Sequence, residues 1–201
     1  NWNGTTSFSW NGFDGTVYAL VAASVNITVD AVNDEPIVID IAKNIDEDNT
    51  LLFAVVDFTS AFSDVDASSL TKIKITSLPA NGTLQLSGVD VNLNDEILVS
   101  DLGNLTFTPD ANWNGSTSFE WNGFDGTAYA LVNASVNITV NAVNDTPVLS
   151  DIIMADNEDN AIIFTALDFT SAFTDVDGNS MTKIKVASLP LNGTLKLSGV
   201  A

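Results

Sequence analysis

The sequence contains no cysteine and no histidine, and only 6 of its 201 residues are basic. The lack of cysteine excludes disulfide bonds and a structural zinc site with cysteine ligands. The lack of histidine removes the commonest general base and metal ligand. We therefore expect that the protein is not an enzyme. An extracellular protein without disulfides is more typical of bacteria or archaea than of animals.

Acidic residues outnumber basic ones by 26 to 6, which gives a formal net charge of −20. Such a charge repels nucleic acids and anionic membranes, so neither is expected as a partner. No apolar run is long enough for a membrane-spanning helix, so direct insertion into a membrane is not expected either. The carboxylates either keep the protein soluble or bind divalent cations, and their placement decides between the two.

An internal repeat with a spacing of 111 residues divides the chain. Residues 1–35 match residues 112–146 at 29 of 35 positions, and residues 36–90 match residues 147–201 at 32 of 55 positions. The predicted domains are therefore the C-terminal part of one repeat (1–35), a complete repeat (36–146) and the N-terminal part of the next (147–201). About 110 residues is a typical size for one domain. We interpret the chain as an excerpt of a longer tandem array.

The complete repeat has the alternating apolar pattern of short β-strands separated by turns. Within 71–76, for example, Ile73 and Ile75 fall on one face and two lysines on the other. The Asn-Gly pair that ends Pro79–Gly82 predicts a tight turn. Strands are expected at 37–41, 51–56, 71–76, 83–86, around Leu105 and Phe107, around Phe119 and Trp121, and at 136–140. Val56–Phe62 could form one helical turn, and 89–103 is left unassigned. The pattern predicts an all-β, seven-stranded sandwich.

A Val-Asn-Asp-x-Pro motif separates the repeats. It occurs at Val32–Pro36 and again at Val143–Pro147. Proline cannot donate a hydrogen bond to a neighbouring strand, so it marks the end or edge of a sheet. The Asn-Asp pair beside it offers amide and carboxylate oxygens. We interpret the motif as a linker that takes part in cation binding.

Acidic residues gather at the two ends of the predicted sandwich if its seven strands alternate in direction. One end, called the top, carries Asp64, Asp66 and Asp125 next to Asn33 and Asp34. The other end, called the bottom, carries Asp46, Glu47, Asp48 and Asp110 next to Asn144 and Asp145, with Asp175 and Asp177 of the following repeat. This placement predicts cation sites at the junctions between repeats.

Calcium is the expected ion because it takes six to eight oxygen ligands from carboxylates, carbonyls and water. The spacing of Asp64 and Asp66 suits such a loop, and Glu47 could bind through both of its oxygens. Crowded carboxylates without a cation would also lower stability. The next repeat retains the equivalents Glu158, Asp175 and Asp177. The alternative is that these residues form solvated loops in which aspartate caps turns.

The repeat resembles the cadherin-like repeats of large bacterial surface proteins, including RTX-type adhesins. The resemblance rests on Asp46-Glu47-Asp48, Asp64-Val65-Asp66, Pro79–Leu84, Phe107–Gly115, Ser118-Phe119, Asp125-Gly126 and the linker motif. It implies Ig-like seven-stranded sandwiches in tandem, stiffened by calcium at their junctions. By analogy with cadherins, the calcium ligands would be Asp64 and Asp66, Asp125, Glu47 and the Asn33-Asp34 linker.

Two departures from the animal cadherin pattern imply fewer ions. The Leu-Asp-Arg-Glu motif is replaced by Pro109–Asn112, and Ala31 or Ala142 stands where the animal linker has another aspartate. We expect one or two calcium ions at each junction rather than three.

These features predict an extracellular or cell-surface structural repeat that spaces or projects binding domains. Its expected partners are neighbouring repeats of the same chain and, beyond them, surface glycans or proteins. One alternative is a self-assembling filament or surface-layer subunit, in which like chains complete the partial repeats. Another is a carbohydrate-binding module that uses the loop 110–115. Trp121 is expected in the core, and Trp113 is expected to plug or anchor the core, with ligand contact as its alternative.

Overall fold

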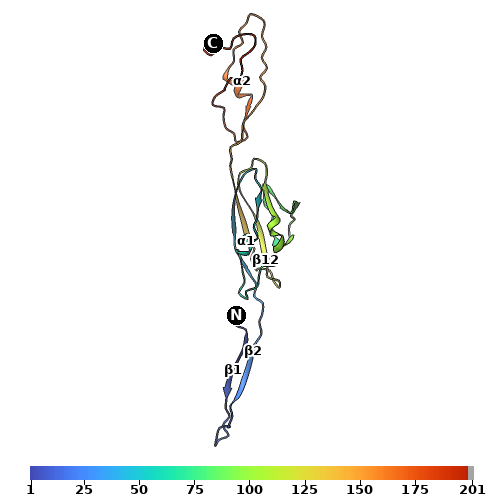
Figure 1. Ribbon diagram of the computed structural model, residues 1–201, viewed down its shortest axis with the longest axis vertical. Helices are drawn as coiled ribbons and strands as arrows, with labels where there is room; N and C mark the ends of the chain where they lie inside the picture. The colour runs from blue at the N-terminus through green and yellow to red at the C-terminus, as the bar shows by residue number, and fades with distance from the viewer. Residues whose placement is uncertain (199–201) are drawn as a thin grey trace. The chain divides into compact units, whose positions relative to one another are not determined.

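The computed structural model describes residues 1–198, and the chain divides into two compact units between Ala142 and Val143. The first unit begins with an antiparallel hairpin of β1 (Gly4–Trp10) and β2 (Ala23–Val29) (Figure 1). Gly4 lies opposite Val29, and Trp10 lies opposite Ala23. The complete repeat follows in the same unit.

Two β-sheets with a shared apolar core make up the complete repeat, which confirms the predicted all-β sandwich. The five-stranded sheet has the order β10-β7-β12-β13-β4, and the four-stranded sheet has the order β5-β11-β8-β9. The first sheet consists of β4 (Ile41–Asp46), β7 (Lys72–Ile75), β10 (Glu96–Leu98), β12 (Gly115–Phe124) and β13 (Ala134–Asn141). The second consists of β5 (Leu51–Leu52), β8 (Gly82–Leu86), β9 (Val89–Asp90) and β11 (Leu105–Pro109).

Strand direction follows the predicted alternation. Strands β4 and β13 pair in parallel, as expected if the first and last of seven alternating strands are neighbours, and the remaining pairs of both sheets are antiparallel. A short pair of β3 (Ile37–Val38) and β6 (Phe62–Ser63) adjoins the sheets, together with the helical turns α1 (Val55–Thr59) and η1 (Val99–Asn104).

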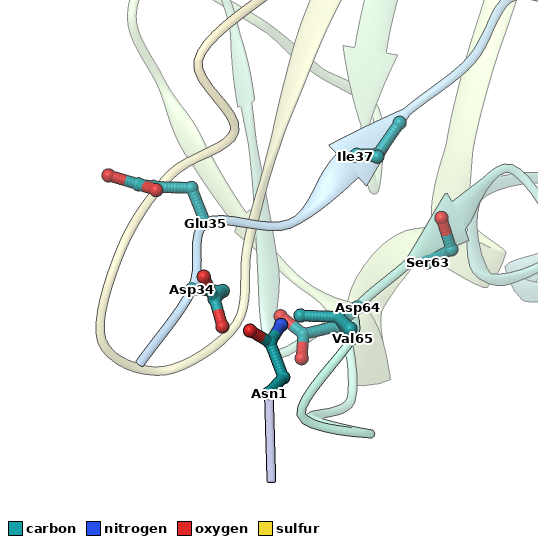
Figure 2. Close-up of a pocket in the computed structure, with 7 residues that line it drawn as sticks. All are labelled: Asn1, Asp34, Glu35, Ile37, Ser63, Asp64 and Val65. Carbon is teal, nitrogen blue, oxygen red and sulfur yellow. The ribbon is translucent and has the colours of Figure 1, made fainter. Parts of the chain in front are cut away.

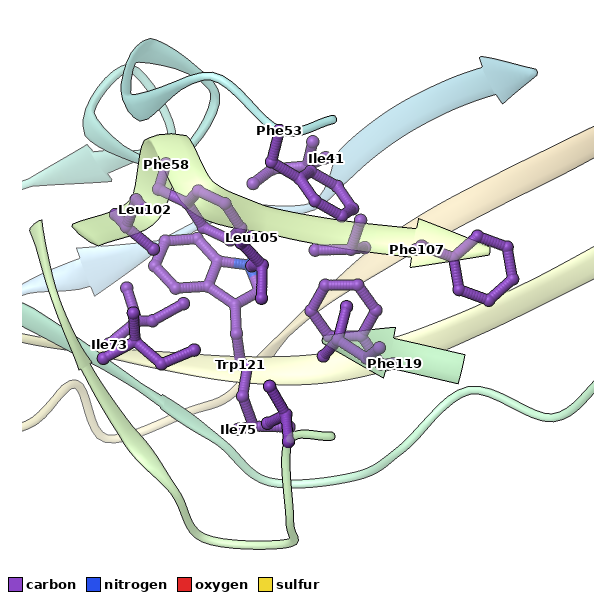
Figure 3. Close-up of a cluster of buried hydrophobic side chains, with 14 of the residues drawn as sticks. Ile41, Phe53, Phe58, Ile73, Ile75, Leu102, Leu105, Phe107, Phe119 and Trp121 are labelled. Atoms are coloured by element: carbon purple, nitrogen blue, oxygen red, sulfur yellow. The ribbon is translucent and has the colours of Figure 1, made fainter. Parts of the chain in front are cut away.

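Aromatic rings lie at the centre of the core (Figure 3). The Trp121 ring is fully buried and meets Phe58 edge-on, with ring centroids 5.2 Å apart. Phe119 meets Phe53 in the same way at 5.8 Å. Such edge-to-face pairs contribute about 0.5–1.5 kcal/mol beyond the burial of their area. The prediction that Trp121 belongs to the core is confirmed.

The predicted strand at 37–41 is wrong in extent. Within this range Ile37 and Val38 pair with β6, whereas Ile41 already belongs to the longer strand β4. Its position is fixed by its parallel partner β13, which places Ile41 beside Val136 and Asp46 beside Asn141. Asp46 is therefore the last residue of a strand and not part of a loop.

The predicted strand at 51–56 ends at Leu52, because the chain turns into α1 from Val55. Asp57 caps this turn by accepting a hydrogen bond from the Ala54 backbone N–H at 2.9 Å. Phe58 then enters the core. The unassigned stretch 89–103 contributes β9, β10 and most of η1, so the two sheets hold nine strands rather than seven.

The second unit repeats the local structure of the first. Its elements are β14 (Val148–Leu149), α2 (Ala166–Thr170) and β15 (Phe173–Thr174), the counterparts of β3, α1 and β6. Strands β14 and β15 pair as β3 and β6 do. Within residues 1–198, no helix has the length and apolar character needed to cross a membrane.

Candidate cation site at the linker

Two loops of the complete repeat hold the linker by hydrogen bonds. The side-chain amide of Asn33 donates to Asp125 Oδ2 at 2.9 Å, and the backbone N–H of Asp34 donates to Asp66 Oδ2 at 2.8 Å. Pro36, which follows, is buried. The structure thus brings together the residues of the predicted top end, although they come from three separate parts of the sequence.

Asp64 organises the loop that contains Asp66. Its Oδ1 accepts hydrogen bonds from the backbone N–H groups of Asp66 at 2.7 Å and Ser68 at 3.2 Å. Its other oxygen, Oδ2, is buried and has no hydrogen-bond partner. A buried acceptor without a partner loses the hydration that it had in the unfolded chain, at a cost of about 1–3 kcal/mol or more for a charged group. This oxygen is therefore suited to a cation.

Asp125 contributes the second loop, and the residue is only 8% exposed. Its Oδ1 accepts hydrogen bonds from the backbone N–H groups of Thr127 and Ala128, the latter at 2.6 Å. Burial raises the pKa of Asp125, but the hydrogen bonds from Ala128, Asn33 and Thr127 outweigh it and leave the pKa below its ordinary value. The carboxylate is therefore charged at neutral pH.

A hollow of about 440 Å³ lies beside these groups. Figure 2 shows the Asp34 side chain pointing toward Asp64, whereas Glu35 points away. The lining residues are Asn1, Asp34, Glu35, Ile37, Ser63, Asp64 and Val65. Charged oxygens therefore border a space that water or an ion can enter.

The residues predicted for the bottom end are only partly brought together. Asp46 Oδ1 accepts a hydrogen bond from the side chain of Asn141 at 3.0 Å, and Asp48 Oδ1 accepts one from the backbone N–H of Asn112 at 3.0 Å. Glu47 is 2% exposed, and its N–H donates to the carbonyl of Asn141 at 2.9 Å. These contacts connect the end of β4 and the turn that follows it to neighbouring segments of the same sandwich.

The acids at this end differ in their surroundings. Asp110 is exposed, and its backbone carbonyl accepts a hydrogen bond from the N–H of Trp113 at 3.1 Å. Trp113 itself is half-buried against the core, as predicted for a core plug. Asn112 and Asn141 were not among the predicted site residues. The pairing of β13 with β4 places Asn141 beside Asp46, and the loop between β11 and β12 places Asn112 beside Asp48. Neither contact can be read from local sequence.

The second unit repeats the arrangement of the linker. The N–H of Asp145 donates to Asp177 Oδ2 at 2.7 Å, and the N–H of Asp177 donates to Asp175 Oδ1 at 3.1 Å. The side chain of Asn179 donates to Asn144 Oδ1 at 3.2 Å. The geometry of the linker is therefore a property of the repeat. The predicted contact of Asn144, Asp145, Asp175 and Asp177 with the acidic residues of the preceding sandwich stays a prediction.

Glu158 shows how the surroundings change a repeated position. It is exposed, unlike its counterpart Glu47, because the described residues of the second unit include no strand equivalent to β13.

Asp14 keeps the structure of its counterpart Asp125. It was not predicted as a site residue, although the 111-residue spacing identifies it. Its Oδ1 accepts hydrogen bonds from the N–H groups of Thr16 at 2.7 Å and Val17 at 2.8 Å. The aspartate loop thus forms from local sequence alone.

The chemistry of the linker site fits calcium. Asp64, Asp66 and Asp125 supply hard oxygen donors, Asn33 supplies an amide oxygen, and one carboxylate oxygen of Asp64 has no other partner. Among residues 1–198, no three acidic side chains are close enough together to form a metal-binding group by themselves. A cation here would therefore use amide or backbone oxygens and water in addition to the carboxylates.

The facing sheets, the parallel pairing of the first and last strands and the Asn-Asp linker define a sandwich of the cadherin-like class. The sequence profile of the cadherin-like domain matches residues 32–141, which is more than half of the chain. The chain therefore belongs to the cadherin-like domain family, whose members are typically extracellular. No curated protein matches it.

Solved structures show only a distant likeness. An endo-fucoidan hydrolase of glycoside hydrolase family 107, MfFcnA4, is 19% identical, with a TM-score of 0.32 over 76% of this chain. A variant of the same hydrolase is 22% identical, with a TM-score of 0.30 over 70% of this chain. The chain spans only 22% and 19% of the length of these two structures.

Proposed function

We propose that this cadherin-like repeat is a calcium-stiffened spacer or adhesive segment of an extracellular, cell-surface protein. Its work is mechanical rather than catalytic, since it would hold neighbouring repeats in a fixed relation and project a binding domain from the surface. Its partners would be neighbouring repeats of the same chain and, through the projected domain, surface glycans or proteins.

One observation carries this proposal. The linker is tied to both aspartate loops through Asn33 and Asp34, and the buried Asp64 Oδ2 beside it has no partner. Asp64, Asp66, Asp125 and the Asn33 amide oxygen would hold calcium there. Calcium would supply the missing partner and cross-link the linker to the sandwich, which removes bending freedom at Asn33-Asp34.

Thermal unfolding of the 201-residue chain in calcium and in chelator tests the site. A ligand that binds only the native state raises the free energy of unfolding by about 1.4–2.7 kcal/mol at ten to a hundred times its dissociation constant. We expect this stabilisation in the native sequence and its loss in Asp64→Asn. Asp90→Asn is the matched control, because it removes the same charge from an exposed position on β9.

Limited proteolysis tests the stiffening itself. Cleavage at Asn33-Asp34 should be slow in calcium, fast in chelator and fast in Asp64→Asn under both conditions. If calcium stabilises Asp64→Asn as much as the native sequence, the ion binds elsewhere. If calcium changes neither stability nor cleavage of the native sequence, the carboxylates only organise loops and the proposal is wrong.

A further inference from the structure

The loop that carries Asp125 is a tight hairpin closed by two aromatic residues. The backbone N–H of Asp125 donates a hydrogen bond to the Ala128 carbonyl at 3.1 Å. Phe124 and Tyr129 form the bridge that closes the turn, and their ring centroids lie 4.7 Å apart. Because Asp125 directly follows Phe124 in the chain, the position of the two rings determines the position of the carboxylate.

The shape of this hairpin is set by its own residues. The copy around Asp14 has the same backbone hydrogen bond, from the Asp14 N–H to the Val17 carbonyl at 3.1 Å. The ring centroids of Phe13 and Tyr18 lie 4.9 Å apart there, which is close to the spacing in the complete repeat. Contacts with neighbouring strands are therefore needed to decide where the hairpin lies, and not to form it.

Strands β7 and β10 hold the hairpin of the complete repeat through charged side chains. The Tyr129 hydroxyl donates to Glu96 Oε1 at 2.5 Å, and Lys72 Nζ donates to Glu96 Oε2 at 2.6 Å. Lys74 Nζ lies 4.3 Å from the Tyr129 ring centroid. Lys72 Nζ lies 4.6 Å from that of Phe124. The hydrogen bonds from Lys72 and Tyr129 lower the pKa of Glu96, so this carboxylate is a charged acceptor at neutral pH.

The same attachment reaches the other aspartate loop. Strand β7 follows the loop that contains Asp64 and Asp66. Thr71, between that loop and β7, donates to the Phe124 carbonyl from its backbone N–H at 2.9 Å and from its hydroxyl at 3.0 Å. The two loops are thus joined one residue away from Asp125. A contact that fixes the end of β12 therefore also fixes the distance between the carboxylates of the two loops.

We propose that Tyr129 and Glu96 are positioning residues of the cation site. Their hydrogen bond holds the hairpin so that Asp125 meets Asn33 and the loop at 64–66. Neither residue binds the ion. They keep the two loops in the arrangement that calcium requires before calcium arrives, so less order has to be gained on binding. This inference rests on the calcium site proposed above.

Calcium titration calorimetry of the 201-residue chain tests the proposal. Tyr129→Phe removes the hydroxyl, keeps the ring and leaves the charge of the chain unchanged. It should weaken calcium binding by about tenfold, which is the lower end of the effect of residues that orient metal ligands. In the Glu96→Ala background, Tyr129→Phe should weaken binding no further, because the tyrosine acts through that carboxylate.

Two variants that change no charge are matched controls. Tyr18→Phe makes the same substitution in the hairpin around Asp14. Thr117→Val removes the hydroxyl that donates to the Ala80 carbonyl at 2.6 Å, at the opposite end of β12 from Phe124. Both variants should bind calcium as tightly as the native sequence does. Thr117→Val thereby separates a loss of stability from a loss of position.

Amide hydrogen exchange in chelator gives a readout that needs no bound ion. The Thr71 N–H, which joins the two loops, should exchange faster in Tyr129→Phe than in the native sequence and in Tyr18→Phe. Unchanged exchange at Thr71 overturns the proposal. So does native-like calcium binding of Tyr129→Phe, or an equal loss in Thr117→Val, although the calcium site itself would then stand. A native sequence that binds no calcium refutes the calcium site, and this inference with it.

Discussion

Phe119→Ala should destabilise the complete repeat strongly, whereas Phe8→Ala, at the same position of the preceding repeat, should not. Phe119 is fully buried and meets Phe53 edge-on at 5.8 Å, while Phe8 is 55% exposed. Truncating a buried phenylalanine costs about 3–5 kcal/mol, through lost burial and the cavity that remains. Truncating an exposed one on a surface costs roughly 0.5 kcal/mol or less.

Calorimetric unfolding at high dilution measures this difference in one chain. For a domain of about 110 residues, each kcal/mol changes Tm by roughly 4 °C, so Phe119→Ala should lower the Tm of the main transition by about 12–20 °C. Phe8→Ala should leave that transition within about 2 °C of the native value. Equal losses in the two variants would refute the reasoning, because they would mean that the hairpin and the sandwich share one core.

Two further predictions concern single positions in the same sandwich. Gly82→Ala should lower the free energy of unfolding by about 1–3 kcal/mol, because a Cβ there would lie 2.5 Å from the Phe107 ring and 2.7 Å from the Thr108 carbonyl oxygen. Gly103→Ala should be nearly neutral, because its Cβ would lie 3.9 Å from its nearest neighbour. Urea titration of both variants measures the difference. The hydrogen bonds of Asp125 lower its pKa on folding, so its contribution to stability is present above its ordinary pKa and is lost as pH falls through the lower, folded value. The stability advantage of the native sequence over Asp125→Asn should therefore shrink below about pH 4, and an advantage that stays constant from pH 7 to pH 2 would contradict the assignment.

Short-range patterns in the sequence predicted the faces of the strands well. The alternation in Lys72–Ile75 places Ile73 and Ile75 in the core, and Asn81 in the predicted turn adopts a positive φ of 56°. Such features depend on neighbours along the chain, so they can be read from a single sequence. The grouping of the linker with the loops at 64–66 and 125 was also predicted, because strict alternation of strand direction fixes which loops share an end.

The errors arose where a distant partner decides the local structure. The start of β4 at Ile41 depends on its pairing with β13, nearly a hundred residues later. The switch from strand to helix after Leu52 depends on Asp57 as a cap and on the site that Phe58 fills against Trp121. The β-branched residues before Asp57 favour a strand by propensity, and tertiary packing overrides that preference. Neither partner is visible in a window of local sequence.

The copies of the repeat separate features that depend on nearby residues from features that depend on distant strands. The hairpin and the capped turn form in both copies, as β1–β2 and β12–β13 and as α1 and α2, because their partners lie close in sequence. Lys183–Val186 has the same alternation as β7, yet the structure gives it no strand. Strand β7 is held between β10 and β12, which lie outside its own segment. The alternation thus specifies which side chains face the core, and the strand itself forms only where a neighbouring strand can pair with it.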